Sequence, residues 1–184
     1  MTAKTWSLAL ALCLVSLVQA SSAAAQAPPK NVDAKKFLEE LNRDIWTPFT
    51  QAYATGNPDQ YLGLHSKDFI RGQGDSKRVM NLAQYSEGVR RSFQQWKQNG
   101  LKVDLQFRFL ERIADDQLAS ERGIYQLSLT DAKGEVRRLY GKFHVFSRKE
   151  NGVRKILVDY DSSEGETIGE KDYQAGFAPD AFDR

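Results

Sequence analysis

Hydrophobic residues first recur every four positions, at Phe37, Leu41, Ile45, Phe49 and Tyr53. This spacing places them on one face of a helix that begins near Asp33. Pro48 interrupts the stripe, so we expect it to kink or divide the helix. Gly56 fits the end of this helix, and Asn57-Pro58 fits the cap and first turn of a short second helix that runs to Leu64.

A third helical stripe carries its apolar residues at Tyr85, Val89, Phe93 and Trp96. It ends at Asn99-Gly100, a pair that favours a helix stop. Between the second and third helices, residues 68–71 predict a brief strand, and the glycine-rich residues 72–76 predict a loop.

The hydrophobic period changes to two from Leu101 onward, where Val103, Leu105 and Phe107 alternate with charged and polar residues. Such alternation is typical of a strand with one buried face. Further strands are predicted over 119–129, 136–148 and 154–160, the last two joined by the hairpin signal Asn151-Gly152. Helices followed by an antiparallel meander indicate an α+β fold, with three N-terminal helices packed on a curved, mainly antiparallel sheet.

The strand predicted over 136–148 is apolar on both faces. Helices cover only one face of a single curved sheet, so the second face needs another cover. We favour homodimerisation through the sheet, and the alternative is an edge that the C-terminal tail covers. Residues 163–184 are polar and acidic, and we expect a loosely ordered tail there.

The N-terminus has the order of a secretory signal, with Lys4 before an apolar run over 6–18 and then small residues. The run is shorter than the roughly 20 apolar residues of a spanning helix, so no retained membrane anchor is expected. We predict cleavage near Ala25, export to the periplasm or the medium, a linker over 26–36 and one domain over 37–162.

Cleavage after Ala25 would leave 159 residues with 25 basic and 24 acidic side chains. A near-neutral domain gives no electrostatic basis for binding nucleic acid. The only cysteine, Cys13, would leave with the signal, which excludes disulfides and thiol catalysis from the domain. No phosphate-binding or dinucleotide motif is present, and the two histidines lack metal-ligand spacing, so no metal or cofactor is expected.

Several segments resemble the nuclear transport factor two-like superfamily, also called the SnoaL-like or ketosteroid isomerase-like cone fold. The segments are residues 45–53 running into 56–59, residues 64–69, and the closing hairpin formed by 141–148 and 151–162. The resemblance implies a cone-shaped α+β barrel that often holds a small apolar ligand. Arg154 stands where many relatives carry an aromatic residue, so the resemblance identifies no subfamily.

The resemblance implies a ligand pocket inside the cone. Its candidate lining residues are Trp46, Phe49, Tyr53, Phe69, Arg71, Tyr85, Phe93, Tyr125, His144, Phe146 and Tyr160. An aromatic stripe on a helix is also typical of plain core, and this alternative stays open.

His144 and Asp68 are the candidate catalytic residues. His144 falls near the position where ketosteroid isomerases present an acidic group, but it is also compatible with a hydrogen-bonded core histidine. Gly72-Gln73 occupies the place of the isomerase carboxylate base, and neither side chain takes up a proton. We therefore favour a non-catalytic domain that binds a small apolar or amphipathic molecule or a partner, with a small lyase, isomerase or hydrolase that uses His144 as the alternative.

An acidic run at the C-terminal end resembles a calcium loop, with oxygen-bearing side chains at Asp159, Asp161, Ser163 and Glu170. Glu164 stands where such a loop needs glycine, and the preceding segment reads as a strand. We therefore interpret this run as solvated tail.

Overall fold

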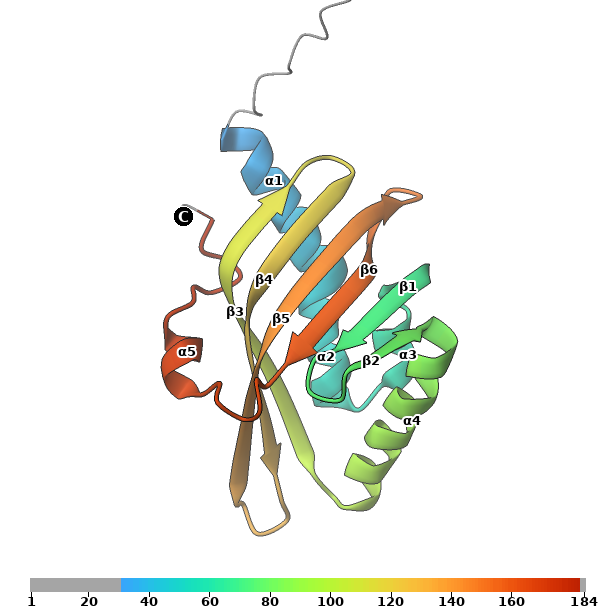
Figure 1. Cartoon of the computed structure of the whole chain (residues 1–184), viewed down its shortest axis with the longest axis vertical. Helices are drawn as coiled ribbons and strands as arrows, with labels where there is room; N and C mark the ends of the chain where they lie inside the picture. The colour runs from blue at the N-terminus through green and yellow to red at the C-terminus, as the bar shows by residue number, and fades with distance from the viewer. Residues whose placement is uncertain (1–30, 183–184) are drawn as a thin grey trace, which may run out of the picture.

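Six strands form one curved sheet, and the main helices pack against its concave face (Figure 1). The computed structural model describes residues 31–182. The strand order is β2-β1-β6-β5-β4-β3, and only the neighbours β1 and β6 run parallel. The sheet does not close, because β2 and β3 are its two edges. These features confirm the predicted α+β class with a mainly antiparallel sheet.

The first helical stripe forms one continuous rod made of α1 (Asn31–Leu41), a π-helical turn η1 (Asn42–Trp46) and α2 (Thr47–Thr55). The Thr47 amide donates to the Asn42 carbonyl, five residues back, instead of four. Pro48 has no amide hydrogen to donate, and the wider turn just before it accommodates this loss. The proline therefore produces a π turn in place of the kink or break that we expected.

The remaining N-terminal helices are α3 (Pro58–Leu62) and α4 (Leu82–Gln98). Gly56 ends α2 in the left-handed conformation, with φ of 67°, as predicted. The Asn57 side chain accepts a hydrogen bond at the start of α3, and Asn81 forms a capping box at the start of α4.

The first strand is longer than predicted, and it has an unpredicted partner. β1 (His65–Gln73) begins three residues before the strand start that we predicted at residue 68. β2 (Arg78–Asn81) lies antiparallel to β1 and leads directly into α4. This short edge strand has no alternating pattern of its own, so its hydrogen bonds to β1 define it.

The four-stranded meander is confirmed. Its strands are β3 (Lys102–Ala114), β4 (Leu118–Thr130), β5 (Val136–Glu150) and β6 (Val153–Ser162). Asn151 and Gly152 have φ of 51° and 82°, as a two-residue hairpin turn requires. Two strands each contain one extra residue that shifts the pairing. In β3 it is Leu110, after Phe109, and in β6 it is Leu157, opposite Phe146 of β5.

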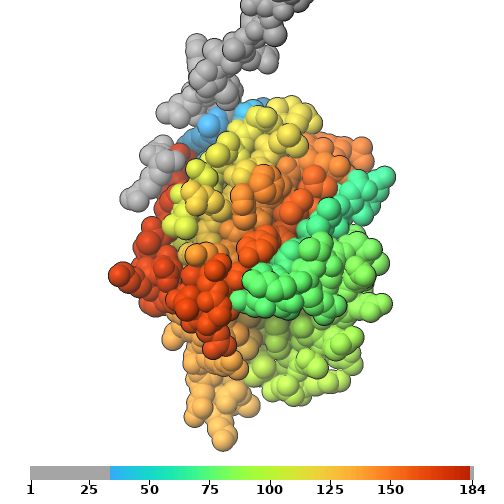
Figure 2. Space-filling view, in the orientation of Figure 1, coloured from blue at the N-terminus to red at the C-terminus, as the bar shows by residue number. Residues whose placement is uncertain are grey.

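The C-terminal segment packs on the sheet, so the loosely ordered tail that we expected is wrong for residues 163–182. It contains α5 (Glu170–Gln174), whose Tyr173 is buried. Phe177 and Phe109 exchange two backbone hydrogen bonds at the β3 edge, of 2.8 and 2.9 Å. The segment lies over part of the outer face of the sheet, which Figure 2 shows in red.

A buried ion pair joins this segment to the core. Arg112 and Glu121 pair across β3 and β4 at 2.7 Å, with side chains that are 2% and 0% exposed. Glu121 also accepts from the Trp46 indole at 2.9 Å, and Arg112 donates to the Pro179 carbonyl at 2.6 Å. One charged pair therefore links the helical rod, the sheet and the C-terminal segment.

The predicted signal sequence and its cleavage site lie outside the described residues. Helix α1 begins at Asn31, within the stretch 26–36 that we had interpreted as a linker. Across residues 31–182, every helix is too short or too polar to span a bilayer.

Candidate functional site

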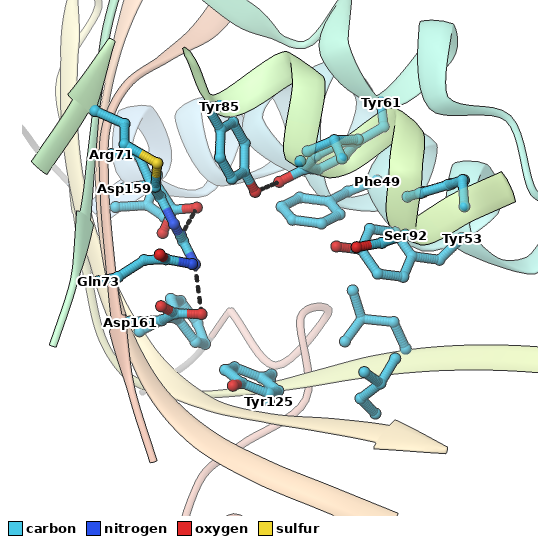
Figure 3. A pocket seen from close by; sticks show the side chains of 18 of the residues that line it. Phe49, Tyr53, Tyr61, Arg71, Gln73, Tyr85, Ser92, Tyr125, Asp159 and Asp161 are labelled. Carbon is cyan, nitrogen blue, oxygen red and sulfur yellow. Dashed lines mark hydrogen bonds and ion pairs between the residues drawn. The ribbon is translucent and has the colours of Figure 1, made fainter. Parts of the chain in front are cut away.

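A cavity of about 470 Å³ lies between α4 and the concave face of the sheet (Figure 3). Aromatic and aliphatic side chains from the helical rod, α4, β3 and β4 form one of its walls. They include Trp46, Phe49, Phe93, Trp96, Leu105 and Leu127. Phe49 packs edge-on against Phe107, with ring centroids 5.1 Å apart. This wall suits the flat or branched hydrocarbon part of a small molecule.

Charged side chains form the opposite wall. The Arg71 guanidinium on β1 contacts Asp159 through Nη1 and Asp161 through Nη2, the latter at 2.5 Å. The side chains of Arg71 and Asp159 are only 7% and 6% exposed, whereas that of Asp161 is 25% exposed. Asp161 is therefore the most exposed member of this ion triad.

The parallel pairing of β1 with β6 brings the triad together. Arg71 is the register partner of Asp159, and Gln73 is the partner of Asp161. Side chains of paired residues share a face, so all four point to the concave side. The extra residue at Leu157 shifts which side chains of β6 point inward. Ile156, before it, and Asp159, after it, are therefore both buried on the inner face.

Burial controls the protonation of the triad. It raises the pKa of Asp159 from 3.8 to about 6, although the Arg71 charge opposes the shift and the Asp161 charge adds to it. Asp159 is thus a carboxylate whose pKa is raised toward neutrality, a property that is common in functional sites.

Four tyrosines surround the space between the two walls. The hydroxyls of Tyr61 and Tyr85 lie 2.6 Å apart, and burial raises the pKa of both phenols. Burial likewise raises the pKa values of Tyr53 and Tyr125. All four therefore stay protonated and can donate hydrogen bonds at neutral pH.

The ring of Tyr125 lies against the sheet because its cross-strand partner is Gly141. A Cβ atom at position 141 would lie 2.5 Å from the Tyr125 hydroxyl oxygen. The glycine therefore leaves the cavity open at this place.

The cavity reaches solvent at one end. Arg78, Glu87 and Arg91 line this end, and all three are exposed. A ligand that enters here passes charged side chains before it meets the aromatic wall.

Most of the predicted lining residues come together in this cavity. They are Trp46, Phe49, Tyr53, Arg71, Tyr85, Phe93 and Tyr125. Phe69 is buried beneath the cavity, where its ring packs against His65 and Tyr85 at centroid distances of 4.4 and 5.4 Å.

The other three predicted lining residues, His144, Phe146 and Tyr160, lie on the outer face of the sheet. Phe143 and Val145 point inward from β5. Side chains alternate along a strand, so His144 and Phe146 point outward. His144 pairs with Tyr160 across the strands and forms a hydrogen bond of 2.9 Å with Ser120. Placing these residues in the pocket was therefore wrong.

Neither catalytic candidate faces the cavity. Asp68 is at the surface, where it forms an ion pair with Arg148 at 2.5 Å. His144 lies on the far side of the sheet. His65 is buried beside the aromatic cluster, and its Nδ1 lies 3.1 Å from the Tyr61 carbonyl oxygen.

Of the polar wall, the sequence predicted Arg71 but not its partners. Asp159 and Asp161 were assigned to an acidic run that solvates the tail, and Gln73 was interpreted as loop. No local pattern identifies the two carboxylates, because the extra residue at Leu157 decides which side chains of β6 face inward. Within residues 31–182, no three His, Cys, Asp or Glu side chains gather closely enough to hold a metal ion.

Comparisons with solved structures show the same fold in other proteins. Aln2 from a Streptomyces species matches with a TM-score of 0.58 at 12% identity, over 74% of this chain and 93% of that chain. An NTF-2-like protein of unknown function from Shewanella oneidensis matches with a TM-score of 0.53 at 14% identity, over 67% and 97%.

A ketosteroid isomerase-like protein from Erwinia carotovora atroseptica matches with a TM-score of 0.51 at 12% identity, over 68% of this chain and 94% of that chain. No family model and no curated protein matches the sequence. The chain therefore has the nuclear transport factor two-like fold that its sequence resembles, and identities this low establish the fold alone.

Proposed function

We propose that this protein binds a small amphipathic molecule inside the cone and does not chemically transform it. One observation carries the proposal: an aromatic wall and a buried ion triad face the same solvent-reaching cavity. A cavity of about 470 Å³ falls within the range of small-molecule sites. Protonated tyrosines around it supply hydrogen-bond donors that would fix the orientation of the ligand.

The arrangement of the ionisable groups favours binding over catalysis. Asp159 and Asp161 both contact Arg71, and the Asp159 side chain is only 6% exposed, which leaves a substrate little access to it. His144 faces away from the cavity, which argues against the alternative of an enzyme that uses this histidine.

A fluorescent dye provides the test. N-phenyl-1-naphthylamine is small, uncharged and weakly fluorescent in water, and we expect its emission to rise when it enters the cavity. The variant Ser92→Phe places a ring inside the cavity from α4 (Figure 3) and should abolish the signal. The control Gln95→Phe places the same ring on the exposed side of α4.

Retention of dye binding by Gln95→Phe together with its loss in Ser92→Phe supports the proposal. Failure of the wild-type protein to bind, or equal binding by Ser92→Phe, overturns it.

We also propose that two copies associate through the part of the outer face that the C-terminal segment leaves uncovered. Ile70, Phe146 and Tyr160 are exposed there, on three neighbouring strands. Sedimentation should detect a dimer that Phe146→Glu dissociates and that Val136→Glu, at the far end of β5, does not. A wild-type monomer at all concentrations contradicts this proposal.

The proposed location is outside the cytoplasm, as the signal-like N-terminus predicts. N-terminal sequencing of the protein from the cell envelope or the medium should find Gln26 as its first residue. An intact N-terminus in the cytoplasmic fraction contradicts it.

A further inference from the structure

The charged wall of the cavity carries information about the ligand beyond its size. Two carboxylates, on Asp159 and Asp161, face a single guanidinium, on Arg71. The other charged lining residues, Arg78, Glu87 and Arg91, are exposed at the mouth, where water screens them. With both carboxylates ionised, the inner recess therefore holds one negative charge in excess.

The charge of Arg71 is already compensated by carboxylates. Its Nη1 contacts Asp159 and its Nη2 contacts Asp161, and its Nε is buried without a partner. The accepting capacity of the triad lies in the carboxylate oxygens, chiefly those of Asp161, the most exposed member. These oxygens accept hydrogen bonds and attract positive charge.

Aromatic rings favour the same kind of ligand group. The Arg71 guanidinium already lies over the Tyr85 ring, and its central carbon, Cζ, is 5.3 Å from the ring centroid. The ring of Tyr125 lines the cavity near Asp161, and that of Tyr53 lines the opposite side (Figure 3). Ring faces carry partial negative charge and stabilise a nearby cation.

We infer that the ligand is an amphipathic amine, whose protonated nitrogen contacts Asp161 and whose hydrocarbon part lies against the aromatic wall. This inference rests on the proposed binding function and specifies its ligand class. An ammonium group would neutralise the excess charge of the recess, a hydroxyl group would only form a hydrogen bond, and a carboxylate would be repelled.

Three probes with one hydrocarbon body test the inference by isothermal titration calorimetry on the purified protein. They are 2-(2-naphthyl)ethylamine, 2-(2-naphthyl)ethanol and 2-naphthylacetic acid, compared at about pH 7.5, where the amine and the acid are both ionised. We expect the amine to bind about tenfold more tightly than the alcohol, and the acid to bind most weakly.

The variant Asp161→Asn should weaken binding of the amine about tenfold while it leaves binding of the alcohol within about twofold. Glu39→Gln, an equivalent change on the exposed side of α1, should alter neither. The comparison of the three probes on the wild-type protein needs no variant, so it decides the matter even if Asp161→Asn does not fold.

The outcomes separate the two proposals. If the alcohol or the acid binds as tightly as the amine, or if Asp161→Asn weakens all three equally, the amine inference is overturned and ligand binding by the cone stands. If none of the probes binds, both are overturned.

Discussion

Two buried groups should make the stability of this protein respond to pH in opposite directions. His65 packs among Tyr61, Phe69 and Tyr85, and burial lowers its pKa from 6.5 to about 4. Asp159 lies in the ion triad, where burial raises its pKa from 3.8 to about 6. Both side chains are almost fully enclosed, so we expect the free energy of unfolding to depend on the protonation of each.

The signs follow from proton binding. Between about pH 4 and 6.5 the unfolded chain binds more protons at His65 than the folded chain, so this residue makes folding more favourable as the pH rises. At Asp159 the folded chain binds more protons between pH 3.8 and about 6, so this residue makes folding less favourable over that window. Each shift exceeds two pH units and corresponds to about 3 kcal/mol, and the two nearly cancel in the wild type.

Single substitutions should reveal each contribution in urea unfolding at a series of pH values. As the pH rises from 4 to 6.5, the free energy of unfolding of His65→Phe should fall by about 3 kcal/mol relative to that of the wild type. As the pH rises from 4 to 6, the free energy of unfolding of Asp159→Asn should increase by about 3 kcal/mol relative to that of the wild type. Carboxylates with a lowered pKa, such as those of Asp75 and Asp115, are shared by all three proteins and cancel in these differences. Profiles of both variants that run parallel to the wild type would refute the reasoning.

Two further substitutions test the cavity and the link to the C-terminal segment. Gly141→Ala should push the Tyr125 ring into the cavity and weaken dye binding several-fold. It should also lower the free energy of unfolding by about 1 kcal/mol. Unchanged dye binding would contradict the assigned cavity. Arg112→Met should cost about 3–5 kcal/mol in urea unfolding because it leaves the Glu121 carboxylate buried without its partner. The double variant with Glu121→Met should recover much of that loss, and a double variant as unstable as the single one would contradict this explanation.

Periodicity was sufficient to predict most of the fold. The stripes that contain Phe49 and Phe93 and the alternation around Phe107 give the correct helices and strands, because each element buries one face at its own repeat. Pattern does not detect β2, whose four residues are ordered by pairing to β1. It also does not detect the packing of Tyr173 and Phe177, which are isolated apolar residues in a polar segment.

The apolar side of the site and Arg71 were predicted, but the two carboxylates that contact Arg71 were not. Helical stripes identified Phe49, Tyr53 and Phe93, but the polar wall depends on one extra residue, Leu157, that inverts the alternation of β6. Without that bulge Tyr160 would face the cavity and Asp159 would not. A bulge of this kind is decided by the neighbouring strands, so the local sequence does not reveal it.

Side-chain NMR during titration with 2-(2-naphthyl)ethylamine tests the central claim most directly. Trp46 and Trp96 line the cavity, whereas Ile113 and Leu118 are exposed on the outer face. Our account predicts that the indole signals of both tryptophans shift in a saturable manner while the methyl signals of Ile113 and Leu118 stay in place. Shifts confined to the outer face, or no saturable shift of either indole, would contradict it.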